Sequence, residues 1–287
     1  MRVVAGKRAP ADFVLWRAAK PNDLQQWDSP WGRGNPGWHI ECSAMSRALL
    51  GPEIDIHTGG EDHIAVHHNN EIAQSEAASG RPFVRYWMHV AFLTMNGEKA
   101  SKSLGNVVYL SDIAKKGYHP LALRYFFLQA HYRTPLSFSW DALAAANNAL
   151  ERLWRLAREI AVESGRESKS SEAQDRFLAA VRDDLATPQA LSVLWESLRS
   201  EDYSPEEKQG LVEVADAHLG LALLSPPEER LQAADVPEAV AHLLKERAAA
   251  RERKNYAEAD RLRAEIEASG YHVEDGPGGT VLTPNAF

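Results

Sequence analysis

Three residues with metal-binding side chains are the first feature of this sequence that could do chemistry. His67 and Glu71 are four positions apart, a spacing that places both on one face of an α-helix. Cys42, the single cysteine of the chain, lies upstream. An imidazole, a carboxylate and a thiolate are all ligands that Zn²⁺ accepts. The spacing alone leaves two interpretations open: a zinc site, or a buried cysteine that packs as a small apolar side chain beside an ordinary surface pair.

A loop with two lysines is the second such feature. Lys99 and Lys102 are three residues apart in a segment flanked by Gly97 and Gly105. Lysines on a loop of this kind can neutralise the charge that builds on phosphate groups as pyrophosphate leaves. The alternative is a solvated basic loop with no function. Together with the metal-binding residues, the loop makes residues 37–103 typical of a nucleotide-using enzyme that holds a metal.

The segments that carry these residues have the pattern of a nucleotide-binding sheet. Residues 38–50 are predicted to form a helix that carries the cysteine near its start, and residues 53–57 alternate with the period of a strand. A glycine turn at 58–60 then leads to a helix over about 67–79. Strand, glycine turn and helix form the βα unit of a nucleotide-binding fold. Residues 86–95 are predicted to form another strand, which ends at a turn just before the lysine loop.

The rest of the chain is predicted to be mostly helical, with a terminal hairpin. Proline, glycine and serine separate the amphipathic segments, and we expect Thr187 and Ser204 to be helix N-caps. The predicted helices cover residues 110–116, 120–130, 142–163, 171–184, 188–198, 205–219, 237–255 and 256–269, and the hairpin strands lie at 271–273 and 280–282.

Composition limits the class of protein. The chain has 287 residues, of which 44% are hydrophobic and 25% charged, as in ordinary globular proteins. We expect no membrane-spanning segment, because no apolar run approaches the roughly 20 residues that a transmembrane helix needs. The start of the chain has no apolar signal core, and one cysteine excludes an internal disulfide. These features favour a cytoplasmic protein. The net charge of −8 argues against a surface covered in phosphate contacts, although not against local basic faces.

The motifs, taken in order, resemble those of cysteinyl-tRNA synthetase, a class I aminoacyl-tRNA synthetase. The similar segments are Gly-Trp-His-Ile-Glu-Cys-Ser at 37–43, His-His-Asn-Asn-Glu-Ile-Ala-Gln-Ser at 67–75, Lys-Ala-Ser-Lys-Ser at 99–103 and Asp-Asp-Leu-Ala-Thr-Pro-Gln-Ala-Leu at 183–191. The resemblance covers essentially the whole chain. The family's His-Ile-Gly-His signature and its first zinc cysteine are not found in this sequence. The resemblance therefore implies the C-terminal part of such an enzyme, in which a separate N-terminal half is a possible partner.

The resemblance implies roles for the metal-binding residues and their neighbours. It assigns the zinc ligands to Cys42, His67 and Glu71. Trp38 matches the tryptophan that lines the family's amino-acid pocket, and His39 beside it is a further pocket candidate; for Trp38 a role as a core anchor is an equal alternative. His68 has no assigned role in the metal shell, and we expect it to pack or to support a ligand.

The resemblance also implies an ATP site, with magnesium accompanying the nucleotide. Gly59, Gly60 and Asp62 match the family's Gly-Gly-x-Asp, in which glycines admit a nucleotide closely and the acid accepts ribose hydroxyls. Lys99 and Lys102 match the signature loop Lys-Met-Ser-Lys-Ser, with alanine in place of methionine. Both lysines are implied as catalytic, and Lys102 as ATP-binding.

The fold class implied is α/β, with three domains. Residues 1–139 would be the C-terminal half of a Rossmann-like catalytic domain, residues 140–235 a helical tRNA-binding bundle, and residues 236–287 a small α+β domain on the anticodon side. Seven basic and four acidic residues lie between 245 and 263. A salt-bridged helix pair is the ordinary interpretation of that segment, and a phosphate contact to tRNA is the one that the resemblance favours.

The predicted function is cysteine–tRNA ligase, with cysteine, ATP and tRNA-Cys as substrates and zinc as cofactor. We expect the chain alone to activate cysteine poorly, because the histidine signature that contacts ATP in this family is missing from it. Two alternatives stay open at this point. One is a catalytically incomplete paralogue or fragment that binds tRNA or zinc. The other is a related ligase that joins cysteine to an amino-sugar and shares the zinc motif.

Overall fold

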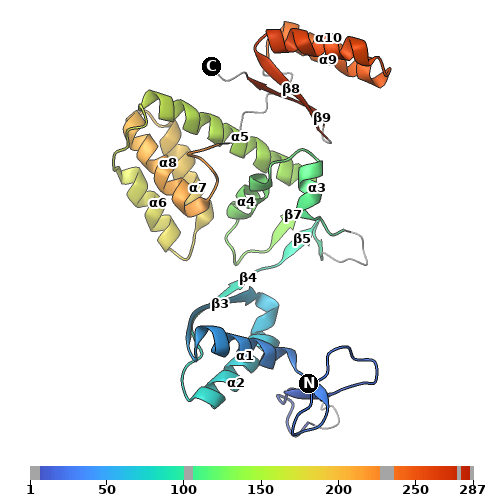
Figure 1. Cartoon of the computed structure of the whole chain (residues 1–287). Coiled ribbons are helices and arrows are strands. Elements are labelled where there is room, and N and C mark those ends of the chain that lie inside the picture. The colour runs from blue at the N-terminus through green and yellow to red at the C-terminus, as the bar shows by residue number, and fades with distance from the viewer. Residues whose placement is uncertain (1–6, 100–105, 227–235, 277–278, 285–287) are drawn as a thin grey trace. The chain divides into compact units, whose positions relative to one another are not determined.

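A computed structural model describes residues 7–99, 106–226, 236–276 and 279–284 (Figure 1). The chain divides into two compact units. The first comprises residues 1–92 with 132–135, and the second comprises residues 93–131 with 136–287. The metal-binding residues belong to the first unit. The predicted domain boundaries at 139/140 and 235/236 stay predictions.

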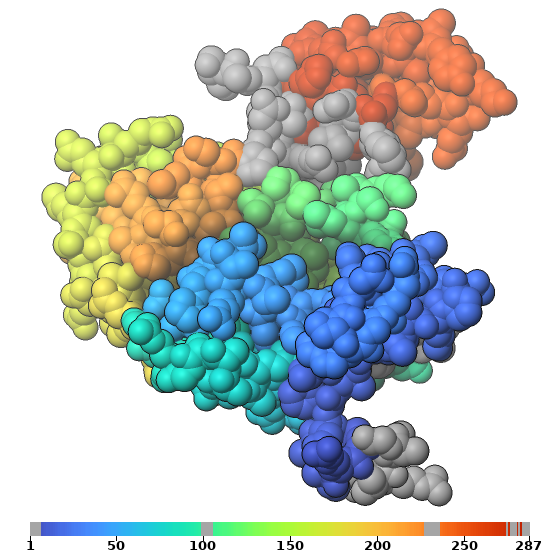
Figure 2. All heavy atoms as spheres, turned by 60° about the horizontal axis from the view of Figure 1, so that its bottom comes forward, coloured from blue at the N-terminus to red at the C-terminus, as the bar shows by residue number. Residues whose placement is uncertain are grey.

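Two parallel strands and two helices form the centre of the first unit. β3 (Ile54–Gly60) pairs with β4 (Val84–Val90), while α1 (Trp38–Leu50) packs against α2 (Asn69–Ser79). In Figure 2 the spheres of this unit, blue to cyan, form one continuous body. The predicted helix over 38–50 is confirmed. The predicted glycine turn is wrong, because Gly59 and Gly60 continue the strand and pair with β4.

The connection from β3 to α2 is helical from its first residue. A 3-10 turn (Glu61–His63) and a π-helical turn (Ile64–His68) precede α2. The helix was expected to begin at His67, so helical backbone begins six residues earlier, although its end at Ser79 is confirmed. A π-helical turn rotates side chains relative to a regular helix and is frequent at functional sites. Here it carries both neighbouring histidines into the interior.

A small antiparallel pair precedes α1. β1 (Trp16–Ala18) and β2 (Gly34–Pro36) are joined by an irregular segment that contains Pro21, Pro30 and Gly32. β4 ends at Val90. The next residue, Ala91, leaves the strand pairing, and its amide donates to the Tyr132 carbonyl. The single strand predicted over 86–95 is therefore wrong, since this break in the pairing separates β4 from a second strand, β5 (Leu93–Met95).

The second unit begins with a three-stranded sheet. β5 (Leu93–Met95) pairs in parallel with β7 (Leu136–Phe138) and antiparallel with β6 (Glu98–Lys99). A two-residue turn joins β5 to β6, with φ of 51° at Asn96 and 84° at Gly97. Positive φ at both central residues is the geometry that Asn-Gly favours in a hairpin. The turn predicted before the lysine loop is confirmed.

Six helices follow and share one core. They are α3 (Leu110–Lys115), α4 (Pro120–Leu128), α5 (Trp140–Glu163), α6 (Glu172–Arg182), α7 (Thr187–Arg199) and α8 (Pro205–Leu219). All six were predicted, and their buried faces form one cluster that includes Leu150, Phe177 and Leu194. Apolar residues at helical spacing make such a face. Among the described helices, none combines the length and apolarity that crossing a membrane requires.

The two predicted N-caps differ in outcome. Ser204 caps α8, since its hydroxyl accepts from the Glu207 amide at 3.3 Å while the Glu207 carboxylate accepts from the Ser204 amide at 2.8 Å. This reciprocal pair is a capping box. Thr187 is not a cap, because it is already the first residue of α7 and Ala186 holds the cap position. Pro188 at the start of α7 needs no amide partner, which makes a side-chain cap less necessary there.

The C-terminal segment has its own small core. α9 (Glu238–Glu252) packs along α10 (Tyr256–Ala268), and β8 (Tyr271–Gly276) pairs with β9 (Gly279–Pro284). The predicted helix pair and hairpin are confirmed. The buried apolar residues between helices and hairpin are Val236, Val240, Ile266, Val273 and Leu282.

Candidate metal centre and nucleotide pocket

Cys42, His67 and Glu71 come together in the first unit. Cys42 projects from α1, His67 from the π-helical turn and Glu71 from the first turn of α2. One ligand atom from each lies within 4.8 Å of the others. Glu71 is completely buried, His67 is nearly so, and Cys42 is half-buried. The structure thus brings the side chains of the three predicted ligands together, although they come from three different helical segments.

The Glu71 carboxylate is the strongest indication that a cation belongs there. Its Oε2 lies 2.6 Å from His57 Nε2. Its Oε1 lies 2.8 Å from His67 Nε2, but among the described residues this buried oxygen makes no hydrogen bond. An unsatisfied buried carboxylate oxygen is costly unless a charge or donor compensates it. A metal ion among the three residues would compensate it and would use the thiol and imidazole as further ligands.

The predicted amino-acid pocket residues surround His67. His39 Nδ1 lies 2.9 Å from His67 Nδ1. That contact orients the imidazole and leaves Nε2, on the glutamate side, available to a metal, as outer partners of metal-binding histidines commonly do. The Trp38 ring lies 4.0 Å from the His67 ring, centroid to centroid, and 55% of Trp38 is exposed. Trp38 is therefore not a core anchor, because it presents an aromatic face to solvent beside the metal-binding residues.

His57 and His89 belong to this site but escaped the sequence analysis. His57 on β3 holds Glu71, as described above, and His89 Nε2 on β4 lies 2.8 Å from His68 Nδ1. His68 is buried, which agrees with the packing or supporting role expected for it. The predicted strand over 53–57 placed His57 on one of its two faces, and this was the available signal. Without knowledge of which helix covers that face, the signal did not indicate a partner.

Burial sets the protonation of these groups in the metal-free chain. The pKa of the Cys42 thiol is raised to about 11, first by burial and then by the Glu71 carboxylate. Burial lowers the pKa of His67 and brings that of His68 to about 4, with neighbouring histidines adding to the shift of His68. At neutral pH the thiol is therefore protonated while both imidazoles are neutral.

A pH dependence of metal binding follows from this protonation. A bound zinc ion needs the Cys42 thiolate, so binding must release the thiol proton, whereas His67 is already neutral. We expect zinc affinity to rise about tenfold per pH unit between roughly pH 7 and 9, the slope for one proton released. Competition with a chromophoric chelator at several pH values measures the slope. A slope near zero would contradict cysteine as a ligand, and a slope near two would show that a second ligand is also protonated.

The two glycines at the end of β3 leave room for neighbouring side chains of this site. A Cβ on Gly59 would lie 2.6 Å from Cε1 of the buried His68 ring, and one on Gly60 would lie 2.4 Å from Asp62 Oδ1. Real Cβ atoms do not approach other atoms so closely, so both positions exclude any larger residue unless the neighbour moves. Glycine is therefore required at position 59 because the His68 ring packs against it. The sequence had suggested a different reason, the close approach of a nucleotide.

A pocket of about 230 Å³ opens at the carboxyl ends of β3 and β4. It is lined by Glu61, which follows β3, by Trp87 and His89 on β4, by Ala91 just after β4, and by Ile64 and Arg133. The Trp87 and His89 rings are stacked with an angle of 2° between their planes. Ligands of open α/β sheets bind outside the carboxyl ends of the strands. The pocket therefore lies where ligands of such sheets bind, and its lining includes two aromatic rings and an arginine.

The lysines of the signature loop are placed only in part. Lys99 ends β6, where its backbone pairs with Thr94 in the second unit. Lys102 lies outside the described residues. The structure therefore brings together the residues predicted for the metal, the amino-acid pocket and the Gly-Gly-x-Asp segment, all of which belong to the first unit.

Comparisons with known proteins give consistent matches. The family model described as tRNA synthetases class I (C) catalytic domain matches residues 1–148, and the model of the cysteinyl-tRNA ligase anticodon binding domain matches residues 233–280. Cysteine–tRNA ligase 1 of Burkholderia lata is 50% identical over 97% of this chain, which spans 58% of that relative. The cysteine–tRNA ligase of Legionella pneumophila strain Paris is 44% identical over 98% of the chain, which spans 62% of it.

A solved structure shows the same fold. A LeuRS from Agrobacterium radiobacter K84, crystallised with tRNA and LeuAMS, superimposes with a TM-score of 0.52 at 17% identity. The match covers 71% of this chain and 34% of that one. The expected Rossmann-like α/β architecture of the class I synthetases is confirmed by this likeness.

Proposed function

The chain belongs to the class I cysteinyl-tRNA synthetase family, and on that premise we propose that it is the zinc-binding, cysteine-selecting part of a ligase that joins cysteine to tRNA-Cys with ATP. The observation that carries the proposal is the buried Glu71 oxygen next to Cys42 and His67, which has no hydrogen-bond partner in the part of the chain that the structure describes. This oxygen supports a metal ion among the three residues, and such an ion could bind the thiol of a cysteine substrate. The relatives described above, which are named cysteine–tRNA ligases, are longer than this chain, whose length is about three fifths of theirs.

The residues present fit a zinc ion. Cys42, His67 and Glu71 supply sulfur, nitrogen and oxygen, a mixed set that zinc accepts, and leave room for a substrate ligand. Zinc, when bound, ligates a substrate thiol as its thiolate, which separates cysteine from serine because a hydroxyl is a poorer ligand and keeps its proton. His57 holds Glu71 through Oε2, and His39 orients His67. These two contacts keep the ligands in place before substrate arrives.

The neighbouring residues provide the rest of the substrate site. The exposed Trp38 ring beside His67 gives the substrate side chain an aromatic wall. We place ATP, with its magnesium, at the carboxyl ends of β3 and β4, where Gly59, Gly60 and Asp62 lie next to the pocket that Glu61 lines. Lys99 and Lys102 are proposed to stabilise the charge on the leaving pyrophosphate.

The nature of the acceptor is supported by the C-terminal match. An amino-sugar ligase would share the zinc ligands, but residues 233–280 match an anticodon-binding model. That match favours tRNA as the acceptor. It does not separate a complete enzyme from an incomplete paralogue, a question that an activity measurement decides.

Exchange of labelled pyrophosphate into ATP is that measurement. We expect the chain alone to give little exchange. Adding the part of the Burkholderia lata relative that this chain does not cover is expected to give exchange that depends on cysteine and is lost in Lys102→Ala. The reason is that the lysine removes charge repulsion as pyrophosphate leaves. Serine serves as the control amino acid. Exchange that is equal with serine, or unchanged in Lys102→Ala, would contradict the proposal, as would no exchange in the mixture.

A further inference from the structure

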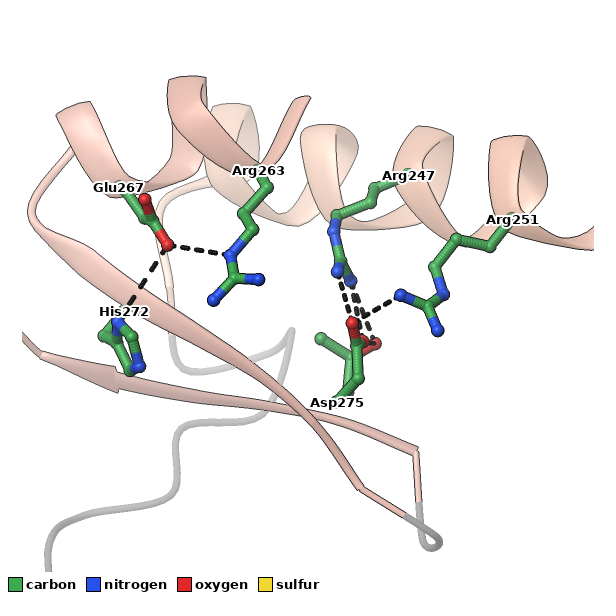
Figure 3. Close-up of polar contacts among 7 residues, drawn as sticks. Arg247, Arg251, Arg263, Glu267, His272 and Asp275 are labelled. Carbon is green, nitrogen blue, oxygen red and sulfur yellow. Dashed lines mark hydrogen bonds and ion pairs between the residues drawn. The ribbon is translucent and has the colours of Figure 1, made fainter. Parts of the chain in front are cut away.

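A buried arginine joins α9 to the C-terminal hairpin. The Arg247 side chain is 2% exposed, and its Nη1 and Nη2 donate to Asp275 at 2.9 and 2.5 Å. Asp275 lies on β8 opposite Thr280 on β9, one pair before the last pair of the ladder. The Thr280 hydroxyl donates to Asp275 at 3.0 Å. Figure 3 shows the arginine reaching from the helix down to the aspartate at the end of the hairpin.

A second arginine uses the same carboxylate. Arg251, one turn further along α9, donates from Nη1 to Asp275 at 2.5 Å, and its side chain is 44% exposed (Figure 3). The Asp275 carboxylate thus accepts from a buried guanidinium on one side and from a surface guanidinium on the other. Arg247 is the main reason that the pKa of Asp275 falls to about 2, so the carboxylate stays charged at neutral pH. The trio carries one net positive charge.

Stability alone is a weak reason for this arrangement. Burying the Arg247 charge costs desolvation that its attraction to Asp275, whose side chain is 26% exposed, only partly repays, and apolar side chains of similar size often do as well. Here the cost is raised further, because Arg247 Nε is buried without a hydrogen-bond partner among the described residues. An apolar pair would also extend the small core of Val240 and Val273. A charged link in this position therefore indicates a requirement other than folding.

Two arginines of α10 are compensated by acidic residues on their own helix. Arg261 pairs with Glu258 and Glu265, and Arg263 pairs with Glu267. These are i,i+3 and i,i+4 pairs of a solvated face, so the ordinary interpretation of a salt-bridged helix holds for them. Arg251 differs, because its acidic partner is itself neutralised by a buried arginine. Its guanidinium is held at the surface, where among the described residues only Nη1 has a hydrogen-bond partner.

We propose that Arg247 is a positioning residue for RNA binding: through Asp275 it holds the guanidinium of Arg251 at the end of the hairpin, where that guanidinium contacts the RNA. Arg247 is too deeply buried to touch a ligand. Its effect is to fix a long side chain in advance, which removes the ordering cost that binding would otherwise include. The inference rests on the proposed function for its ligand, a tRNA.

The test uses the full-length chain and separates the support of the Arg251 side chain from the net charge of the protein. The double variant Arg247→Met with Asp275→Leu removes one positive and one negative charge, so net charge is unchanged while Arg251 loses its support. Binding to a tRNA-Cys transcript and to its anticodon stem-loop is measured by filter retention over a range of salt concentrations. We expect about threefold to tenfold weaker binding, the cost of ordering one flexible side chain. The salt dependence should stay unchanged, because Arg251 is still present.

Arg251→Ala gives the comparison. It should weaken binding and lower the slope of log affinity against log salt by about one, as loss of one phosphate contact does. In the Arg251→Ala background the double variant should have no further effect, because support for a missing side chain is irrelevant. A merely structural role for Arg247 would weaken binding equally in both backgrounds and would overturn the inference. Binding by the double variant as tight as that of the unmodified chain would also overturn it.

Two controls keep the outcome interpretable. Circular dichroism melting reports whether the double variant folds. If it does not, Arg247→Lys replaces it, since lysine keeps the charge but cannot make the two parallel bonds of the guanidinium. The same weakening, again absent in the Arg251→Ala background, is then expected. If the unmodified chain binds neither RNA, the tRNA part of the proposed function fails. Binding by the unmodified chain with no coupling between the two arginines means that only the role of Arg247 fails.

Discussion

Cys42→Ser is expected to abolish stoichiometric zinc binding and to weaken zinc affinity by at least about a hundredfold. Loss of a residue that merely supports a metal ligand costs 10–100-fold, so loss of a ligand should cost no less. Serine keeps the size of the side chain, but its hydroxyl stays protonated and is a poor partner for zinc. Metal analysis after dialysis, followed by chelator competition, measures the change. Because Cys42 is the single cysteine, no other thiol can replace it.

Ser43→Ala is the matched control for this prediction. Ser43 is the next residue on α1, is buried, and donates to Gln74 Oε1 on α2 at 2.8 Å. Its loss perturbs the packing of the same two helices without removing a metal ligand. Full zinc content in Ser43→Ala with none in Cys42→Ser would assign the effect to the thiol. Equal zinc content in Cys42→Ser and the unmodified chain would exclude Cys42 as a ligand.

The second large effect concerns the amino acid. The zinc-loaded chain is expected to bind cysteine at least about a hundredfold more tightly than serine. Apolar pockets separate near-isosteres only weakly, whereas a site built around one polar interaction rejects an analogue that lacks it by far more. Here that interaction is the thiolate–metal bond. Isothermal titration with cysteine, serine and alanine measures the ratio. Removing zinc with a chelator should make the three affinities nearly equal, and a preference that survives zinc removal would assign selectivity to the pocket wall at Trp38.

Local patterns marked Cys42, His67 and Glu71 as candidate ligands, but they did not predict the surroundings of these residues. The i,i+4 spacing of His67 and Glu71, and the helix that carries Cys42, are short-range features that a sequence displays directly. That α1 and α2 pack so that the thiol meets the pair depends on tertiary contacts. For this reason the family resemblance carried that part of the prediction. His57 could be placed on a strand face, but which side chain it would hold depended on the helix above it.

The misplaced elements have similar causes. A β-ladder overrode the turn tendency of Gly59 and Gly60, since the strand partner β4 lies more than twenty residues away in sequence. The π-helical turn has no sequence signature and follows from fitting two histidines into the interior. The Arg247 link was equally hidden, because its partner Asp275 is 28 residues away and the helix pattern indicated only an ordinary charged face. Most helices, the Asn96-Gly97 turn and the C-terminal hairpin were predicted from local chemistry, whereas features that depend on distant partners were not.

Cobalt substitution tests the central claim most directly, because it observes the metal, its protein thiolate and the substrate thiolate together. In the chain loaded with Co²⁺ in place of zinc, we expect a sulfur-to-metal charge-transfer band from Cys42. The band should be absent from Cys42→Ser. Cysteine should strengthen the band as a second sulfur binds, while serine should leave it unchanged. A band that does not respond to cysteine, or that persists in Cys42→Ser, would contradict a metal centre that selects cysteine through its thiol.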